Sequence, residues 1–521
     1  MNRKTIFRSV ILLWAGIAVS TGCSKGDDEA QPGNSGSIAG NVTVKIASDK
    51  KTVLRNPLSG WVLYMSGAWD ETFWQTQGYD KVYVTDLGQN VRVSDYASTC
   101  YIRTGWQRME PEEGKYFWND PSSSLMRLVQ SAWDRGLRVA FRIVVDGRDQ
   151  RLNTPQYVFD AGARWYPDGT NEERKSPYPD DPVFQQKYAK FVEAFAEAFD
   201  DPAKTDFIDA YGLGKWGESH TMIYSSYSNK KQVFDWITSL YSRCFTRVAL
   251  AINYHRLIGA NNTSGWGAVA SDTEALLESA IAKGYSLRHD AFGMNGYYQD
   301  WEKRFASKWN FKRPILMEGG WIISQHRYWT DPTGGYREGH PEDVRRGEFN
   351  ASEEARVNMM DFRVGDETMS WFRDGFDLVQ RFVSEGGYRL YPDQVSVPKS
   401  AKSGQTVTIE HRWLNLGWGY CPTNIPQWNQ KYKVAFALLD AEDRVQKIFV
   451  DTQTDLSTWL KGKPTTYRFD LTLKGVSVGA YTWAVGLVDT TQNNAVGLEM
   501  AVKRSLLTET GWAKVADLKV E

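Results

Sequence analysis

Hydrophobic and polar positions follow two different patterns along this chain of 521 residues. Between about residues 55 and 390, short β-rich apolar runs alternate with longer runs in which apolar side chains recur at helical spacing. The first pattern predicts buried strands and the second predicts amphipathic helices. The expected strands lie at residues 61–66, 100–104, 137–145, 207–213, 247–252, 289–296, 314–318 and near 363–371. Such strand-then-helix units predict an α/β fold of the (β/α)8 barrel type, with a doubly wound parallel sheet as the alternative.

The helical runs carry recognisable start signals. Residues 181–200 begin with Asp181-Pro182, an N-cap followed by a proline favoured in the first turn. Residues 122–135, 233–247 and 272–283 have similar apolar stripes. No GxGxxG follows the first expected strand and no Walker-type loop occurs, so the sequence does not indicate a nucleotide site.

After Gly387 the apolar pattern changes to alternation with period two. Residues 406–413, 433–439, 446–450, 466–473 and 480–488 read as strands separated by turn residues. This alternating pattern of short strands and turns predicts an antiparallel β-sandwich. We therefore expect a barrel domain over residues 41–390 and a sandwich domain over residues 391–521. Residues 40–55 could add a strand to either domain.

The first 23 residues predict an export signal. A basic start precedes a short apolar run at residues 10–19, too short to cross a hydrocarbon core of ~30 Å. Ser-Thr-Gly-Cys follows the run and ends at Cys23. The segment resembles a bacterial lipobox, whose cysteine becomes a lipidated N-terminus; an ordinary signal peptide is the alternative. Residues 24–40 predict a flexible tether, and their acidic start resembles a surface-export signal. We expect an outer-membrane lipoprotein exposed at the cell surface, with the periplasmic face as the alternative.

Composition narrows the possible partners. The 62 basic and 63 acidic residues give a net charge of −1, which provides no electrostatic attraction toward nucleic acid. No CxxC, HExxH or EF-hand pattern occurs, so we expect no cofactor and no metal site of these types. The 22 tryptophans are unusually many. They suit either a large aromatic core or flat platforms for sugar rings.

Two glutamates stand where a barrel places its reactive groups, at the C-terminal ends of strands. Glu218 follows the fourth expected strand, and Glu318 ends the seventh and is followed by two glycines. Two carboxyl groups there suit glycoside hydrolysis, in which one protonates the leaving oxygen and the other attacks the anomeric carbon. The alternative for each is a salt-bridged carboxylate of the barrel rim.

A longer segment carries a family resemblance. Residues 101–118 read YIRTGWQRMEPEEGKYFW. Their spacing of Arg, Trp, Glu-Pro, Gly and Tyr resembles the second-strand segment of clan A glycoside hydrolases, most closely the family 42 β-galactosidases. The whole chain also resembles bacterial lipoproteins in which a barrel precedes a sandwich domain of unassigned function. The resemblance implies a retaining enzyme with Glu218 as acid/base, Glu318 as nucleophile and Arg103 steadying the nucleophile.

One position departs from that clan. The clan usually has an asparagine directly before the acid/base glutamate, where it binds the substrate 2-hydroxyl, and Gly217 stands there in this chain. Loss of that hydrogen bond would weaken transition-state stabilisation. Either another residue makes the contact, or the substrate differs, or activity is weak or absent.

Several residues near the expected strand ends are candidates for sugar binding, because aromatic faces can bury the C–H faces of pyranose rings and polar groups can bind hydroxyls. They are Arg103, Asp146, Trp216, His220, Asn295, Tyr297 and Trp321. Asp146 could equally cap a turn, and the other side chains could equally pack the rim. Residues 146–182 are expected to form a long loop.

The sequence as a whole predicts a surface-anchored glycoside hydrolase that acts on poly- or oligosaccharides, with a carbohydrate as its partner. The rival is a non-catalytic carbohydrate-binding lipoprotein built on a degenerate barrel. A structural surface protein is a third possibility, which predicts no cleft with exposed indoles.

Overall fold

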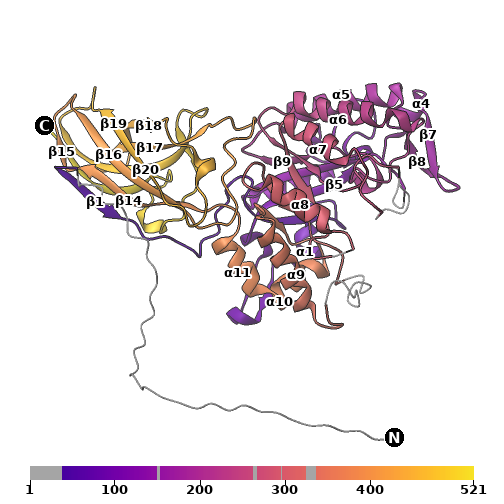
Figure 1. The fold of residues 1–521 in the computed structure, drawn as a ribbon, viewed down its shortest axis with the longest axis horizontal. Helices are drawn as coiled ribbons and strands as arrows, with labels where there is room; N and C mark the ends of the chain where they lie inside the picture. Colours follow the sequence, from indigo (N-terminus) through magenta and orange to yellow (C-terminus); the bar gives the residue numbers. More distant parts are fainter. Residues whose placement is uncertain (1–37, 149–152, 262–266, 295, 324–335) are drawn as a thin grey trace, which may run out of the picture. The chain divides into compact units, whose positions relative to one another are not determined.

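The computed structural model describes residues 38–148, 153–261, 267–294, 296–323 and 336–521 (Figure 1). The predicted signal segment with Cys23, nearly all of the tether, and Asn295 lie outside the described residues.

Eight parallel strands close into a barrel, which confirms the predicted (β/α)8 fold. In chain order they are β2 (Gly60–Met65), β5 (Ala97–Gly105), β6 (Arg138–Val144), β9 (Thr205–Asp209), β10 (Ala249–Asn253), β11 (Tyr285–His289), β12 (Ile315–Met317) and β13 (Met359–Asp361). The last strand pairs with the first, with Met360 opposite Trp61. Because all eight run in the same direction, their C-terminal ends meet at one rim.

Helices connect the barrel strands (Figure 1). The longer ones are α3 (Ser124–Asp134), α5 (Pro182–Phe199), α6 (Lys230–Cys244), α7 (Thr273–Ala282), α8 (Asp300–Trp309), α9 (Pro341–Glu354), α10 (Asp366–Asp374) and α11 (Phe376–Glu385), and the short ones are α1 (Phe73–Thr76), α2 (Trp106–Met109) and α4 (Gln156–Asp160). As predicted, Asp181 caps α5: its carboxylate accepts hydrogen bonds from the backbone N–H groups of Val183 and Phe184 at 3.0 and 3.1 Å.

Three local predictions are wrong. The sixth strand, expected at 289–296, is β11 and ends at His289, because the chain turns through left-handed backbone at Ala291 and Gly293. The eighth strand, expected near 363–371, is β13, and most of that stretch is helix α10, whose first turn carries acidic residues that favour a helix start. The expected loop at 146–182 contains α4 and a hairpin of β7 (Trp165–Asp168) and β8 (Asn171–Pro177).

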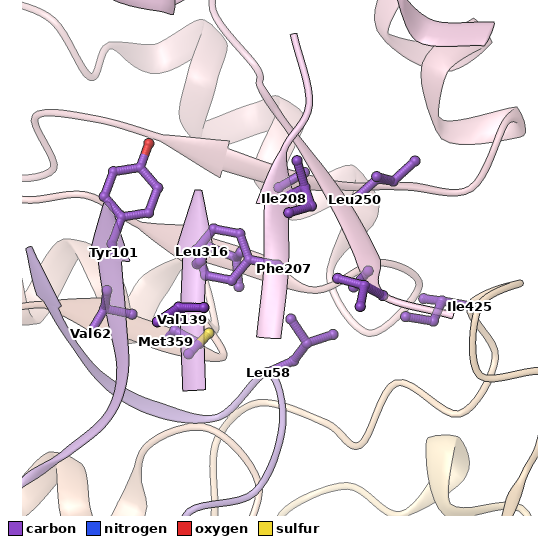
Figure 2. Packing of buried hydrophobic residues seen from close by; sticks show 14 of the residues in the cluster. Leu58, Val62, Tyr101, Val139, Phe207, Ile208, Leu250, Leu316, Met359 and Ile425 are labelled. Atoms are coloured by element: carbon purple, nitrogen blue, oxygen red, sulfur yellow. The ribbon is translucent and has the colours of Figure 1, made fainter. Parts of the chain in front are cut away.

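Aromatic and branched side chains fill the barrel. Tyr101 of β5 and Phe207 of β9 stack with their ring centres 6.0 Å apart, and both are buried (Figure 2). Between the barrel wall and the helices, Trp61 of β2 stacks on Phe362 at 4.1 Å and packs against Trp371 of α10 at 4.9 Å. Many of the tryptophans are fully buried, among them Trp61, Trp74, Trp106, Trp371, Trp413, Trp418, Trp459 and Trp483. Core packing therefore explains a large part of the tryptophan content.

The C-terminal region consists of sheets that are antiparallel, as predicted for a sandwich, apart from one two-residue parallel pair at residues 400–401 (Figure 1, orange to yellow). One sheet has the order β1 (Asn41–Lys45), β14 (Leu390–Pro398), β16 (Thr406–Asn415) and β19 (Thr465–Thr472). The other contains β15 (Ser400–Ala401), β22 (Ala513–Val520), β20 (Gly479–Asp489), β17 (Tyr432–Leu439), β18 (Val445–Asp451) and β21 (Ala495–Leu498). Elsewhere, between β2 and β5 of the barrel, a separate hairpin joins β3 (Val82–Val84) and β4 (Gln89–Val91). Because β1 pairs with β14, the strand before the barrel adds to the C-terminal sheets.

Within the described ranges, no helix is both long and apolar enough to cross a membrane. The described cysteines, Cys100, Cys244 and Cys421, are all free thiols.

Candidate active site

The two glutamates singled out by the sequence lie beyond the C-terminal ends of β9 and β12. Glu318 follows Met317 directly, and its N–H donates to the carbonyl of His289 at 2.8 Å, which extends the barrel pairing by one residue. Glu218 comes after a short turn at Lys215–Gly217, and the amide of Asn253 donates to its carbonyl at 3.1 Å. Both side chains are buried, with 3% and 0% of the surfaces of Glu218 and Glu318 exposed.

Arg142, on β6, joins the two glutamates. Its Nη1 lies 3.2 Å from Oε1 of Glu218, and its Nη2 lies 3.2 Å from Oε2 of Glu318. The same Nη2 lies 2.6 Å from Oδ2 of Asp209, the last residue of β9. One buried guanidinium thus spans the gap between the two carboxylates.

Two further arginines surround Glu318. Arg288 of β11 contacts Oε2 of Glu318, and Arg363, just after β13, contacts Oε1. Burial alone would raise the pKa of Glu318, but these arginines together with Arg142 outweigh it and hold the pKa well below its usual range. Glu318 is therefore an ionised carboxylate in the unliganded site.

Glu218 is also held ionised, by different partners. Burial works to raise its pKa, but a contact with His220 Nε2 at 3.3 Å, together with Arg103 and Arg142, lowers the pKa below its usual value. The Arg103 Nη1 atom lies 3.6 Å from Oε1 of Glu218. The resemblance implied that Arg103 steadies Glu318; its direct ion pair is with Glu218.

Sequence reasoning did not identify the arginine cluster. Arg142 and Arg288 lie in the middle or near the end of apolar strand runs, and both are buried. An arginine that faces the inside of a barrel must have carboxylate partners, since an unpaired buried charge is too costly. Arginine within an apolar strand was therefore the signal that could have located the cluster.

A third carboxylate, Asp361, ends β13 within the same network. Its Oδ2 lies 3.6 Å from Arg288, and its Oδ1 accepts from the backbone N–H of Arg363 at 2.6 Å. Burial, reinforced by the negative charge of Glu318, raises the pKa of Asp361 to about 7 in spite of both arginines.

A pocket of about 540 Å³ opens beside Glu218; we call it the first pocket. Of the residues predicted from the sequence to bind sugar, Arg103, Trp216, Tyr297 and Trp321 line it. Glu218 lines it as well, whereas Glu318 is covered: Arg363, which contacts Glu318, lines the pocket instead.

Asp290 is a lining residue that the sequence analysis missed. It directly follows β11, and its side chain is 12% exposed in the same pocket as Glu218. Burial raises the pKa of this carboxyl, and the charge of Glu218 raises it further. The predicted sixth strand continues past residue 290, so the sequence did not place Asp290 at the C-terminal end of a strand.

Two predicted sugar-binding residues, Asp146 and His220, are not among the described residues that line the first pocket, and both contact other protein groups. The carboxylate of Asp146 accepts from the N–H of Arg148 at 2.9 Å, the Ser176 hydroxyl at 3.0 Å and the Tyr166 hydroxyl at 3.2 Å. These contacts fasten the β7–β8 hairpin to the end of β6 and match the turn-capping alternative. His220 is buried, with Nδ1 2.8 Å from the Thr221 hydroxyl, and it acts on Glu218 from outside the pocket lining.

A second pocket, of about 380 Å³, lies at the end of β5 and the start of α2. Arg103 and Trp321 line both pockets, so the two cavities are adjacent and share one wall. Other lining residues of the second pocket include Tyr64, Trp69, Gln107 and Arg108.

Gly217 has a structural reason to lack a side chain. Its φ is +75°, in the left-handed region that disfavours other residues. A Cβ atom there would lie 3.2 Å from Cδ of Arg142 and 3.3 Å from Cγ2 of Val144. The asparagine expected from the family resemblance therefore does not fit unless the arginine that joins the glutamates moves.

Among the described residues, no group of three or more His, Cys, Asp or Glu side chains is placed to hold a metal ion.

The chain matches no family model and no curated protein. Solved structures with a similar arrangement include an endo-beta-1,4-mannanase from Thermotoga petrophila, with 13% identity, a TM-score of 0.38, and coverage of 90% of this chain and 98% of that chain. They also include a GH30 endoxylanase from Clostridium papyrosolvens C71, with 10% identity, a TM-score of 0.36, and coverage of 82% and 97%. Endo-glycoceramidase II from Rhodococcus sp. has 12% identity, a TM-score of 0.35, and coverage of 82% and 99%. At this level of similarity no substrate or mechanism carries over, and the fold is established by the closed strand pairing of the barrel itself.

Proposed function

We propose that this protein is a glycoside hydrolase whose reacting carboxyl groups are Glu218 and Glu318. The observation that carries the proposal is that both groups lie at the C-terminal rim of the barrel and contact the same guanidinium, that of Arg142, at 3.2 Å each. Glycosidic cleavage needs two carboxyl groups close together, one on each side of the scissile bond. The adjoining pocket offers Trp216 and Trp321 as apolar walls for a sugar ring.

The different surroundings of the two groups support different roles for them. Glu318, held anionic by three arginines, suits the nucleophile of a retaining reaction, which requires a carboxyl separation of about 5–5.5 Å. Glu218 lines the pocket and suits the acid/base, but it must bind a proton first. Substrate therefore has to raise the pKa of Glu218, by displacing water and by drawing Arg103 away from it.

Access to Glu318 sets a second requirement. Its side chain has no exposed surface, and Arg363 stands between it and the first pocket. Arg363 also has a φ of +60°, a sparsely populated conformation for a non-glycine residue that often marks functional sites. In the proposed reaction the sugar displaces the Arg363 guanidinium from Glu318 before attack.

A second candidate function is carbohydrate binding without catalysis. The covered Glu318 and the ionised Glu218 of the unliganded site favour it, as does the absence of a side chain at position 217. This function needs the pocket and its indoles but no proton transfer.

One experiment separates the two functions. Wild-type protein, Glu318→Gln and Glu218→Gln are each incubated with a panel of polysaccharides, and released reducing ends and binding are measured in parallel. Catalysis predicts release by the wild type, loss of at least about a hundredfold in rate in either variant, and retained binding. If the wild type binds a glycan but releases no reducing ends, the protein is a binder. The anomeric configuration of the first-formed product, followed by NMR, tests retention.

We also propose that the protein is anchored at the bacterial cell surface through a lipid on Cys23. The apolar segment before Cys23 supports this. A Cys23→Ser variant is expected to leave the membrane fraction, and its persistence there would contradict the anchor.

A further inference from the structure

A buried carboxyl group on helix α9 lies behind the wall of the first pocket and has no role in the proposed cleavage. The side chain of Glu348 has no exposed surface, and its Oε1 accepts a hydrogen bond from the backbone N–H of Gly320 at 3.2 Å. Gly320 and its neighbour Trp321 line the first pocket, and both belong to the turn that follows Glu318. Since Glu348 is not among the described lining residues, its carboxylate holds this turn from behind.

The turn leaves room for this carboxylate because its first residues lack side chains. A Cβ atom added to Gly319 would lie 3.1 Å from Oε1 of Glu348, closer than most Cβ contacts in proteins. The same part of α9 supports the turn after β11, since a Cβ added to Gly293 would lie 2.8 Å from the backbone N of Glu348. Gly293 comes between Ala291 and Met294, which line the first pocket. Position 348 thus meets two of the turns that form the pocket wall.

Two further side chains connect Glu348 to Arg363, which covers the proposed nucleophile. Nη1 of Arg345, three residues earlier in α9, lies 2.9 Å from Oε2 of Glu348, and its Nη2 lies 2.6 Å from Oε2 of Glu367 in α10. In the same first turn of α10, the Thr368 hydroxyl donates to the carbonyl of Arg363 at 2.7 Å. The turn before the pocket indole and the covering arginine are therefore both attached to one buried ion network.

The position of this carboxyl group is costly for folding. Burial raises the pKa of Glu348 to about 7, although Arg345 opposes the shift. A carboxyl with a raised pKa makes the folded state less stable as the pH rises from about 4 through 7. An apolar side chain of the same size would fill the space without this cost. Perturbed carboxyl groups gather at functional sites, and a role at the pocket wall accounts for this one.

We propose that Glu348 is a positioning residue, which acts through Gly320 to hold Trp321 at the wall of the first pocket. A sugar ring needs the indole face at a fixed distance, because contacts between flat apolar surfaces weaken rapidly once a gap opens. The hydrogen bond to Gly320 restrains the backbone directly before Trp321. A sugar as the ligand rests on the proposed function, whereas the restraint on the turn rests on the contacts of Glu348.

Hydrogen exchange of the full chain tests the restraint without any ligand. The diagnostic variant is Glu348→Met, which keeps an unbranched side chain of similar size and removes both acceptor oxygens, while Arg345 keeps Glu367 as a partner. At pH 8, where Glu348 of the wild type is mostly ionised, the Gly320 amide should exchange about tenfold or more faster in the variant. Mass spectrometry of peptides within residues 314–323 measures the rate. Amides of β10 are the internal reference, because a general loss of stability would accelerate them as well.

Glu353→Met is the matched control on the same helix. Glu353 pairs with Arg381 of α11 at 3.0 Å, and the two side chains are 31% and 41% exposed. The control removes a carboxylate of α9 together with its ion pair, and exchange at Gly320 and in β10 should remain as in the wild type. Glu348→Gln keeps the shape and one acceptor oxygen, so its effect at Gly320 should be local and smaller. It replaces Glu348→Met in the test if that variant does not fold.

A second measurement connects the restraint to glycan binding. Calorimetry with a polysaccharide that the wild type binds gives the dissociation constant and the number of binding sites separately. A variant that only folds less completely loses sites at an unchanged dissociation constant, whereas a displaced Trp321 raises the constant itself. We expect Glu348→Met to raise the dissociation constant about fivefold or more at an unchanged number of sites, and Glu353→Met to change neither.

The outcomes separate this inference from the proposed function. Faster exchange at Gly320 but not in β10 supports the positioning role even if no glycan binds, in which case only the proposed function fails. An unchanged exchange rate at Gly320, an acceleration shared equally by β10, or a glycan dissociation constant equal to that of the wild type overturns the positioning role. Hydrolysis of a glycan by the wild type together with any of these three results leaves the proposed function standing without it.

Discussion

Replacing Arg142 by methionine tests whether the buried guanidinium holds the site together. Arg142→Met keeps an unbranched side chain of similar length but removes the charge and all five N–H donors. It leaves Asp209, Glu218 and Glu318 without the partner that now lies 2.6, 3.2 and 3.2 Å from them. Removing one member of a buried ion pair typically costs roughly 3–5 kcal/mol, because the other charge is left uncompensated.

The retained contacts place the expected loss at the lower end of that range. Glu318 keeps Arg288 and Arg363, Glu218 keeps Arg103, and Asp209 keeps Arg288 at 3.4 Å. We therefore expect the free energy of unfolding to fall by about 3 kcal/mol near pH 7.

The loss should depend on pH in a defined direction. In the wild type, the lowered pKa values of Glu218 and Glu318 contribute stability above the unfolded-state value of about 4.3, and this contribution is lost as the pH falls through the folded-state pKa values. Without Arg142 the folded-state pKa values rise, so part of that contribution is gone. The difference between variant and wild type should therefore be largest where both proteins keep these carboxyls ionised, as near pH 7, and it should shrink only as the pH falls through the raised folded-state pKa values of the variant.

Urea unfolding followed by tryptophan fluorescence measures both effects. Arg127→Met removes an exposed ion pair with Glu71 and an exposed hydrogen bond to the Ser122 carbonyl. It should change the free energy of unfolding by at most about 1 kcal/mol and serves as the control. A loss in Arg142→Met near pH 7 that is no larger than in this control, or one that grows as the pH is lowered, would refute the reasoning.

Two further predictions concern single positions in the same network. Gly217→Asn should destabilise the protein by roughly 1–3 kcal/mol or more, because it combines left-handed strain with a contact on Arg142. Gly475→Asn is the control, because Gly475 has nearly the same φ, +77°, and no atom lies within 4 Å of the added Cβ. Thermal unfolding should show a smaller loss of stability in Gly475→Asn than in Gly217→Asn. Equal losses in the two variants would contradict the steric argument. Asp361→Asn removes a carboxyl whose pKa is raised to about 7. Such a group makes the folded state less stable as the pH rises from about 4 through 7. The free energy of unfolding of the variant minus that of the wild type should therefore be more positive at pH 8 than at pH 5. An exposed substitution, Asp377→Asn, should leave that pH dependence unchanged, and a profile of Asp361→Asn that parallels the wild type would count against the raised pKa.

Much of the fold could be predicted from local patterns. Short β-rich apolar runs identified six of the barrel strands close to their observed positions, and the Asp181-Pro182 signal identified the start of α5. Predictions were wrong where a strand ended in left-handed backbone, at β11, and where a three-residue strand is soon followed by a helix, at β13 and α10. Hydrophobic periodicity carries little information over so few residues, and a turn at a non-glycine residue such as Ala291 has no composition signal.

Part of the candidate site could also be predicted from local patterns. Glu218 and Glu318 follow apolar strands, and the barrel topology then places both at one rim, so local sequence and a general rule sufficed. Asp290 and the buried arginines were missed because their importance depends on which groups face them across the barrel. Arg288 and Glu318 are 30 residues apart in sequence, and Arg142 and Glu318 are 176 apart.

The sequence by itself determined the class of fold, because burial of apolar faces imposes a period that each segment carries within itself. Only the tertiary structure decided the protonation of the site. The pKa of a carboxyl depends on its burial and on the charges within a few ångströms, and these come from strands far apart in the chain. Thus Glu318 is ionised and covered by Arg363, Glu218 is ionised at the pocket wall, and Asp290 has a raised pKa beside it.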